Sequence, residues 1–159
     1  MIFFKMRTPA ALLVIFPVLL IFLSCANANR LICTRVIDGD TIVLSNGEKV
    51  RLIGVDTPET KRPNHPVEYY GKEASAFTKK MVEGIPVKLE DDWQQRDKYD
   101  RLLAYVYLMD GTFLNAEIIK QGYGHASTQL PFKYLEFRQY EKEAMEAKRV
   151  LWADEVKPK

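Results

Sequence analysis

The feature that most constrains this chain is a pair of tight turn signals between short apolar runs in its first half. Asp38-Gly39 separates the run 31–37 from 41–44, and Asn46-Gly47 separates 41–44 from 49–55. Asn-Gly and Asp-Gly pairs favour the positive backbone angles of tight turns, and the β-branched residues around them favour strands. The sequence therefore predicts three successive antiparallel strands.

The rest of the chain alternates between helical and strand patterns. Apolar residues recur at helical spacing over 70–82, 114–121 and about 134–150, whereas 87–89 and 102–108 have the pattern of strands. Five short strands with three helices inserted between and after them indicate an α+β domain. We expect a five-stranded, Greek-key oligonucleotide-binding (OB-fold) β-barrel with three α-helices.

The N-terminal residues have the composition of an export signal. Lys5 and Arg7 precede an apolar run, and Ala26-Asn27-Ala28 offers the small residues that signal peptidase accepts. The run is too short for a comfortable membrane span of about 20 residues, although a retained anchor stays an alternative. We therefore expect a signal peptide over 1–28, one domain over 29–159, and a secreted or periplasmic protein.

Cys25 leaves a second form of export open. It follows Ser24 at the end of the apolar run, where a lipid-modified cysteine would lie, so a membrane-anchored lipoprotein is the alternative. If cleavage follows Ala28 instead, Cys33 is the only cysteine left and no intramolecular disulfide can form. A single cysteine in an apolar strand is expected to be a small buried residue.

Removal of the leader also changes the net charge. The leader carries two of the 23 basic residues and none of the 21 acidic ones, so the remaining chain is formally neutral. Non-specific nucleic-acid binding depends on basic surface. Overall charge therefore gives no reason to propose such a partner, and local chemistry must supply one.

Two carboxylates are expected to meet at neighbouring strand ends. Asp40 opens the second predicted strand and Asp56 closes the third, so a tight hairpin places them side by side. Paired carboxylates resist ionisation unless a cation lies between them. Oxygen donors without histidine or thiolate favour Ca²⁺ or Mg²⁺, and two carboxylates suit the weak affinity (roughly 10⁻⁴ to 10⁻³ M) of extracellular calcium sites. Either motif alone would also serve as an ordinary turn.

Two arginines and a further carboxylate complete the cluster. Arg51 lies in an otherwise apolar strand, where a guanidinium must reach water or meet an anion. Arg101 ends a polar stretch just as a strand begins, and Glu59 has no other evident role. Two guanidinium groups can clamp a phosphate and stabilise the charge of a transition state. These residues predict metal-assisted hydrolysis of a phosphodiester.

Four motifs together resemble the staphylococcal nuclease (thermonuclease) family. They occur in order, at the separations expected of that family, across residues 32–153. The resemblance implies the same OB-fold barrel with three helices. The motifs are Val36-Ile37-Asp38-Gly39-Asp40-Thr41, Val55-Asp56-Thr57-Pro58-Glu59-Thr60, Tyr70-Gly71-x-Glu73-Ala74-Ser75-Ala76-Phe77 and Asp97-Lys98-Tyr99-x-Arg101.

The resemblance implies a role for each matching position. Asp40 and Asp56 match the carboxylates that bind calcium in the family, and the Thr57 carbonyl matches a backbone ligand. Arg51 and Arg101 match its catalytic, phosphate-binding arginines. The implied activity is calcium-dependent hydrolysis of DNA and RNA, single-stranded or locally melted, that leaves 3′-phosphate ends.

The remaining matches concern water and the bound nucleotide. Glu59 matches the residue that orients the attacking water, while Lys98 and Tyr99 match residues that contact the terminal phosphate of a nucleotide. A departure lies at Thr128 and Leu130, which stand where the family has two tyrosines. Stacking of a base on an aromatic ring contributes about 1–3 kcal/mol, so base affinity or preference is expected to differ here.

Two other readings of the same fold stay open. One is a binding module whose catalysis has decayed, which would be expected to lose some of the carboxylates or arginines. The other is an exported interaction protein that binds peptide or glycan, which would have no use for Arg51 and Arg101 as a phosphate clamp. No protein partner is implied, and we expect a monomer.

Overall fold

A computed structural model describes three parts of the chain, residues 30–60, 68–127 and 135–153. The predicted leader and Cys25 lie outside the described residues. The chain divides into two units, Met1–Arg30 and Leu31–Lys159, and every element below belongs to the second. Within the described parts, no helix is both long and apolar enough to cross a membrane.

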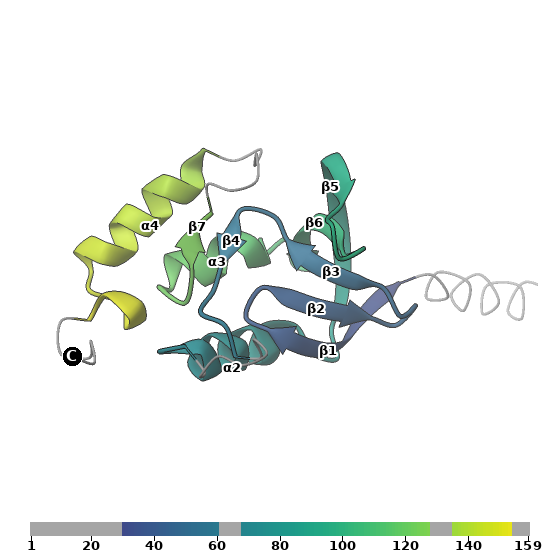
Figure 1. The fold of residues 1–159 in the computed structure, drawn as a ribbon, viewed down its shortest axis with the longest axis horizontal. Helices are drawn as coiled ribbons and strands as arrows, with labels where there is room; N and C mark the ends of the chain where they lie inside the picture. The colour runs from purple at the N-terminus through teal and green to yellow at the C-terminus, as the bar shows by residue number, and fades with distance from the viewer. Residues whose placement is uncertain (1–29, 61–67, 128–134, 154–159) are drawn as a thin grey trace, which may run out of the picture. The chain divides into compact units, whose positions relative to one another are not determined.

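Five strands of the second unit close into a barrel (Figure 1). All neighbouring pairs are antiparallel except β3 and β6, which run parallel. This arrangement confirms the predicted five-stranded barrel, and β2 and β6 have the predicted bounds. The order around the barrel is β1 (Leu31–Asp38), β2 (Thr41–Leu44), β3 (Lys49–Leu52), β6 (Leu102–Leu108) and β5 (Pro86–Arg96).

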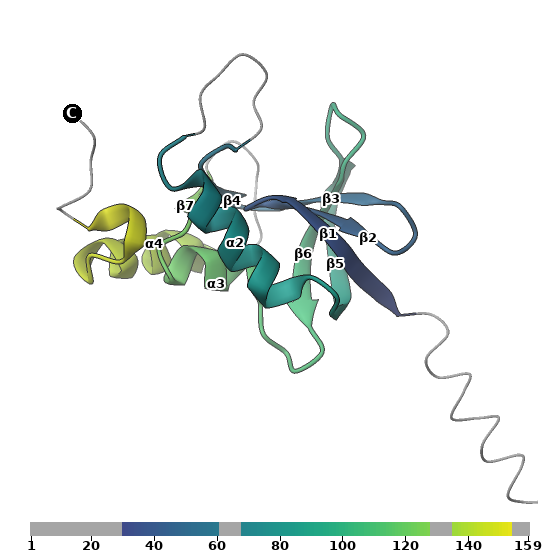
Figure 2. The ribbon, with the colours of Figure 1, turned by 90° about the horizontal axis from the view of Figure 1, so that it is seen from below.

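The described parts of the chain contain the three α-helices predicted beside the barrel. They are α2 (Gly71–Val82), α3 (Leu114–Lys120) and α4 (Glu136–Glu146), and a 3₁₀ turn, η2 (Val150–Trp152), follows the last. The first helix packs against β1, and α3 lies between β6 and α4 (Figures 1 and 2). The last helix is shorter than predicted because Lys148 adopts a left-handed conformation, with φ 50°, just after its end.

Strand alternation sorts the side chains of β2 and β3 into two faces. The inner face contributes fully buried branched residues to the core, each stabilising the fold by about 1.5–3 kcal/mol. The outer face is less buried and holds the charged residues of these strands. The inner residues are Ile42, Leu44, Val50 and Leu52, and the outer ones include Val43, Lys49 and Arg51.

The predicted strand 49–55 is wrong as one continuous element. The chain turns at Ile53-Gly54, where Gly54 has φ 75°, a backbone angle that glycine adopts without strain. Beyond the turn, β4 (Val55–Asp56) leaves the barrel and pairs with β7 (His125–Ala126) in a separate two-stranded sheet. The segment that carries Asp56 is therefore positioned by residues far along the chain.

The buried side chain of Asn115 on α3 holds this turn in place. Its Nδ2 donates to the carbonyl of Ile53 at 2.9 Å, and its Oδ1 accepts from the amide of Val106 at 2.9 Å. A longer contact of 3.4 Å reaches the carbonyl of Ala104. One side chain thus connects the end of β3, strand β6 and helix α3.

Candidate active site

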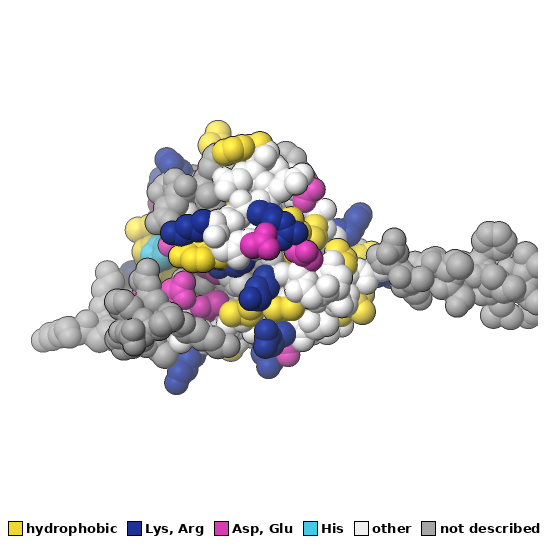
Figure 3. Space-filling model, turned by 45° about the vertical axis from the view of Figure 1, so that its right-hand side comes forward, with side chains coloured by type: hydrophobic (Ala, Val, Ile, Leu, Met, Phe, Trp, Pro, Cys, Tyr) yellow, Lys and Arg dark blue, Asp and Glu magenta, His cyan; other side chains and the backbone are white. Residues whose placement is uncertain are grey.

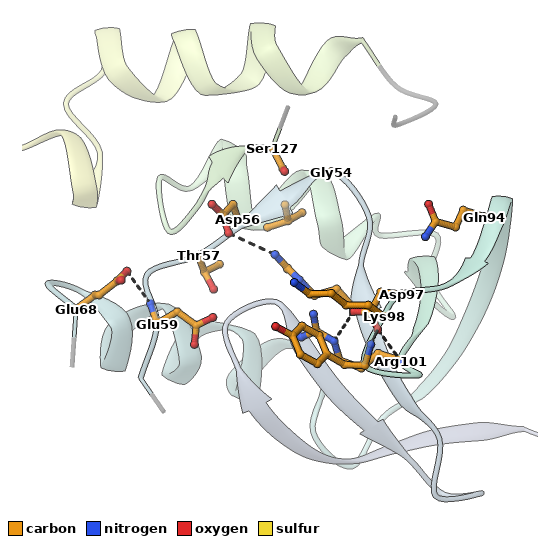
Figure 4. Close-up of a pocket in the computed structure, with 13 residues that line it drawn as sticks. Gly54, Asp56, Thr57, Glu59, Glu68, Gln94, Asp97, Lys98, Arg101 and Ser127 are labelled. Atoms are coloured by element: carbon orange, nitrogen blue, oxygen red, sulfur yellow. Dashed lines mark hydrogen bonds and ion pairs between the residues drawn. The ribbon is translucent and has the colours of Figure 1, made fainter. Parts of the chain in front are cut away.

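Most of the predicted site residues line a single hollow of about 570 Å³. Figure 4 shows Asp56, Thr57 and Glu59 on one side of it and Lys98 and Arg101 on the other. The first group follows the turn at the end of β3, and the second comes from the loop between β5 and β6. Of the eight site residues predicted from the sequence, Asp40 lies beneath the hollow, paired with Arg51. The other seven line it: Arg51, Asp56, Thr57, Glu59, Lys98, Tyr99 and Arg101.

Arg51 lies between the two predicted metal carboxylates. Its Nη1 is 2.6 Å from Oδ2 of Asp40, and its Nη2 is 3.3 Å from Oδ1 of Asp56. The Arg51 side chain is 14 % exposed, and it reaches the hollow from an apolar strand as expected. The two carboxylates therefore do come together, with an arginine as the cation between them.

Asp40 is held firmly from several sides. Its Oδ2 accepts hydrogen bonds from the amide and the hydroxyl of Thr57, both at 3.1 Å, and its Oδ1 accepts one from Thr41 Oγ1 at 3.0 Å. Gly39 allows this approach, because a Cβ there would lie 2.6 Å from the Thr57 hydroxyl. Burial raises the pKa of Asp40, and Arg51 and the Thr57 amide offset only part of that effect.

Glu59 extends into the hollow from the segment after β4. Its amide donates to Oε2 of Glu68 at 3.1 Å, which fixes the backbone, while its side chain stays exposed. Partial burial raises the pKa of Glu59, and so do the carboxylates of Asp38 and Asp40, whereas Arg51 acts in the opposite direction. A carboxylate with a raised pKa is a better proton acceptor, which suits a group that aligns or activates water.

Arg101 is oriented by Asp97 at the start of the same loop. Nε of Arg101 donates to Oδ2 of Asp97 at 2.7 Å, and its backbone amide donates to Oδ1 at 3.0 Å. Because Asp97 takes the Nε edge, the two Nη groups point elsewhere, and Nη1 lies 3.3 Å from the Thr41 hydroxyl. The guanidinium also lies 5.4 Å from the ring centre of Tyr99, and Nζ of Lys98 is 5.0 Å from the same ring.

Comparison with known proteins decides the family. A family profile described as "Staphylococcal nuclease homologue" matches residues 49–154, which is more than half of the chain. The chain belongs to the staphylococcal nuclease family. This confirms the resemblance inferred from the four motifs, and it supports the coarser part of the functional prediction, a nuclease that hydrolyses nucleic acids.

Several curated members of the family are similar over most of the chain. The thermonuclease of Staphylococcus hyicus is 45 % identical over 137 residues, which are 83 % of this chain and 80 % of that protein. The thermonuclease of Staphylococcus intermedius is 49 % identical over 123 residues, or 74 % and 73 % of the two chains. Endonuclease YncB of Bacillus subtilis is 44 % identical over 126 residues, which are 75 % of this chain and 59 % of that protein.

The donor set of this staphylococcal nuclease homologue suits a hard divalent cation. Asp40, Asp56 and the Thr57 carbonyl offer oxygen atoms alone, and the Asp56 side chain is 57 % exposed and open to a ligand. Asp40 is buried with its charge only partly compensated, which a further cation would relieve. In the described parts of the chain, no group of three or more histidine, cysteine, aspartate or glutamate side chains is arranged to hold a metal.

Sequence reasoning missed several residues that position this site. Asp97 had a detectable signal, because it lies four residues before Arg101 within a recognised motif. Glu68 had none, since its contact with Glu59 spans a separation of nine residues without a regular period. His125 was also missed: it pairs with Asp56 across β4 and β7, and its Nδ1 lies 3.2 Å from Glu141.

The predicted departure from the family at Thr128 and Leu130 also lies beyond the described residues. Thr128 and Leu130, which replace the family's tyrosines, belong to the segment 128–134 that the structure does not describe. The expected change in base affinity or preference therefore stays a prediction. The predicted roles of Lys98 and Tyr99 also stay predictions, although both residues line the hollow.

Replacement of Asp97 by asparagine is expected to destabilise the protein in a pH-dependent way. Burial alone would raise the pKa of Asp97, but hydrogen bonds from the Arg101 amide and side chain and from the Tyr99 amide outweigh it and lower the pKa from its ordinary value. A carboxyl with a lowered folded pKa stabilises the fold above its unfolded pKa, and that stabilisation is lost as the pH falls through the folded value. The ion pair to Arg101 should contribute about 1 to 2 kcal/mol.

The measurement is urea unfolding of the parent and Asp97→Asn between pH 7 and pH 3. We expect a constant difference in the free energy of unfolding between the two proteins near neutral pH. The difference should narrow as the pH falls through the range in which the Asp97 carboxyl becomes protonated. Asp110→Asn is a matched control, because Asp110 also has a lowered pKa but is bonded to Thr112 in an exposed turn. If the difference in free energy of unfolding between the parent and Asp97→Asn stays the same down to pH 3, the lowered pKa of Asp97 is contradicted.

Proposed function

We propose that this chain is a calcium-dependent endonuclease that hydrolyses phosphodiester bonds of DNA and RNA. Single-stranded or locally melted regions would be favoured, and the products would carry 3′-phosphate ends. The main support is the convergence of Arg51, Arg101 and Glu59 on one hollow. Two guanidinium groups face a carboxylate whose pKa is raised, beside an oxygen donor set suited to calcium.

The proposed reaction is in-line attack of water on phosphorus. Glu59 orients the water and accepts its proton. The bond from phosphorus to the 5′ oxygen breaks, and that oxygen leaves as a hydroxyl after taking a proton from solvent, so that the phosphate stays on the 3′ end. Arg101 donates its Nη groups to the phosphate oxygens and stabilises the charge that they gain. Arg51 does the same from β3. Lys98 and Tyr99 hold the terminal phosphate of the bound nucleotide.

The donor set supports the proposed metal requirement. A calcium ion held by Asp40, Asp56 and the Thr57 carbonyl would supply positive charge to a phosphate oxygen. Asp40 keeps its hydrogen bonds to Thr41 and Thr57 throughout, which hold the carboxylate in place. In this proposal the chain's own residues perform the remaining steps: they bind the phosphate, orient the water and move its proton.

Cleavage of heat-denatured DNA tests this function. The protein without its leader is incubated with the DNA in calcium or in chelator, beside Glu59→Gln. We expect activity only with calcium and a fall in kcat of about 10²–10⁴-fold for the variant, the range for loss of a general base. End-labelling of the products shows whether the phosphate remains on the 3′ side.

A matched variant shows whether loss of a carboxylate matters in general. Glu146→Gln removes an exposed glutamate from the end of α4, where its partner is Lys142 at 3.8 Å, and kcat should stay near that of the parent. Cleavage that continues in chelator would overturn the calcium requirement. Full activity of Glu59→Gln would overturn its catalytic role.

We also propose that the chain is exported as a monomer. The support is the composition of residues 1–28 and the proposed calcium site, whose expected weak affinity suits a compartment rich in that ion. Attachment through a lipid on Cys25 is the alternative form of export. The N-terminal residue of the mature protein distinguishes cleavage after Ala28 from a lipid-bearing Cys25.

A further inference from the structure

A second, smaller hollow adjoins the first. It has a volume of about 230 Å³ and shares Glu59, Tyr99 and Arg101 with the larger hollow. Its other walls include Ile37 and Lys49, from the outer faces of β1 and β3. A polynucleotide that occupies both hollows must therefore pass the two proposed catalytic residues, Glu59 and Arg101.

Lys49 belongs to a row of side chains that runs away from the catalytic residues. It lies two residues before Arg51 on β3, so both side chains are on the same face, with their Cα atoms about 7 Å apart along the strand. The register then pairs Lys49 with Val43 on β2, and Val43 with Arg35 on β1. Arg35 and Lys49 thus lie two strands apart, or about 10 Å, with Val43 between them.

Both cations of this row are available to an anion. Lys49 and Arg35 are exposed, and neither forms an ion pair with another residue of the described parts. Glu48, the acidic neighbour of Lys49, is bound instead to Arg96 at 3.0 Å. A phosphate that approaches the row would not have to displace an acidic side chain.

The buried acidic group of the second hollow, Asp38, is held by other contacts. Asp38 is buried, and its carboxylate accepts hydrogen bonds from the Gly39 amide and from the amide and hydroxyl of Thr60. Charges elsewhere are mixed: the face in Figure 3 intersperses Lys and Arg with Asp and Glu, without one continuous basic patch. Individual cations must therefore guide a polyanion across this formally neutral domain.

We propose that the row Lys49, Val43 and Arg35 is a phosphate-binding track for the nucleic-acid strand beyond the cleaved bond. The strand would leave Arg101 through the second hollow, with one phosphate on Lys49 and a further one on Arg35. Ile37 and Val43 provide apolar surface for the sugars between them. The track rests on the proposed function, because a nuclease that cuts inside a polymer must hold the strand beyond the reacting phosphate.

Binding measurements test the track separately from catalysis. The dissociation constant of a fluorescent single-stranded oligodeoxynucleotide is measured by anisotropy in chelator, over a series of salt concentrations, for Lys49→Gln, Arg35→Gln and the double variant. Each lost phosphate contact should reduce the slope of log Kd against log salt by about 0.7, and the double variant by about twice that. Lys88→Gln is the matched control, because Lys88 is an exposed strand lysine beside a different hollow.

A second measurement separates the track from the catalytic residues. A dinucleotide is too short to reach the row. The variants should therefore lose far less activity on a dinucleotide than on denatured DNA. The track would be overturned if the track variants had the same slope of log Kd against log salt as Lys88→Gln. It would also be overturned if they lost equal activity on the dinucleotide and on denatured DNA. If the parent protein cleaves no DNA but the slopes change as expected, the track stands and the nuclease proposal fails.

Discussion

Replacement of Arg101 by alanine should lower kcat on denatured DNA by about 10²–10³-fold, the usual effect of losing one preorganised donor to a transition state. Its Nη groups are directed away from Asp97, which takes the Nε edge at 2.7 Å. This orientation is set before substrate arrives, so the guanidinium needs little reorganisation to meet a phosphate. Lysine should restore little of the activity, because it lacks the planar fork that binds two phosphate oxygens.

Arg96→Ala provides the matched control. Arg96 is an arginine of the same part of the chain, but it pairs with Glu48 and Asp100 and does not line the hollow. We expect its kcat to stay within a few-fold of the parent. The measurement is steady-state cleavage with calcium, together with the melting temperature of each variant. A decrease in kcat of less than tenfold for Arg101→Ala would refute a specific role for Arg101. An equal decrease in kcat for Arg96→Ala would refute it as well.

Local sequence signals predicted the barrel well where turn chemistry defines the strands. The Asp38-Gly39 and Asn46-Gly47 turns delimit β2, whose bounds match the prediction, and β6 is a continuous apolar run that also matches. Strand β5 is longer than its predicted core of 87–89 because its charged second half has no apolar alternation to reveal it. Its continuation depends on pairing with β6, as in the Arg96 to Leu102 pair.

The composition of the site was also predictable, whereas its internal contacts were not. The motifs place Asp40, Asp56 and Arg51 within a short stretch, so their proximity follows from the strand order. The sequence does not reveal that the Arg51 side chain lies between the two carboxylates, because that depends on side-chain torsions. The separation of β4 from β3 was equally hidden, since its partner β7 lies about 70 residues later.

Replacement of Asn115 by alanine is expected to cause the largest loss of stability, about 3 to 5 kcal/mol. Asn115 is fully buried, and its removal leaves the Ile53 carbonyl and the Val106 amide without this partner inside the protein. Each unsatisfied buried group costs about 1–3 kcal/mol. Aspartate should not rescue the fold, because it cannot donate to the Ile53 carbonyl and would place a charge in the core.

Urea unfolding followed by tryptophan fluorescence measures this loss, with Asn46→Ala as the matched control. Asn46 accepts one hydrogen bond from the Glu48 amide in an exposed turn, so its loss should cost less than about 1 kcal/mol. Activity should separate the two variants as well, because Asn115 holds the turn at which the chain leaves the barrel toward Asp56 and Glu59. Cleavage per folded molecule should therefore fall for Asn115→Ala and persist for Asn46→Ala. Equal stability of the two variants would show that the Asn115 contacts do not hold β3, β6 and α3 together.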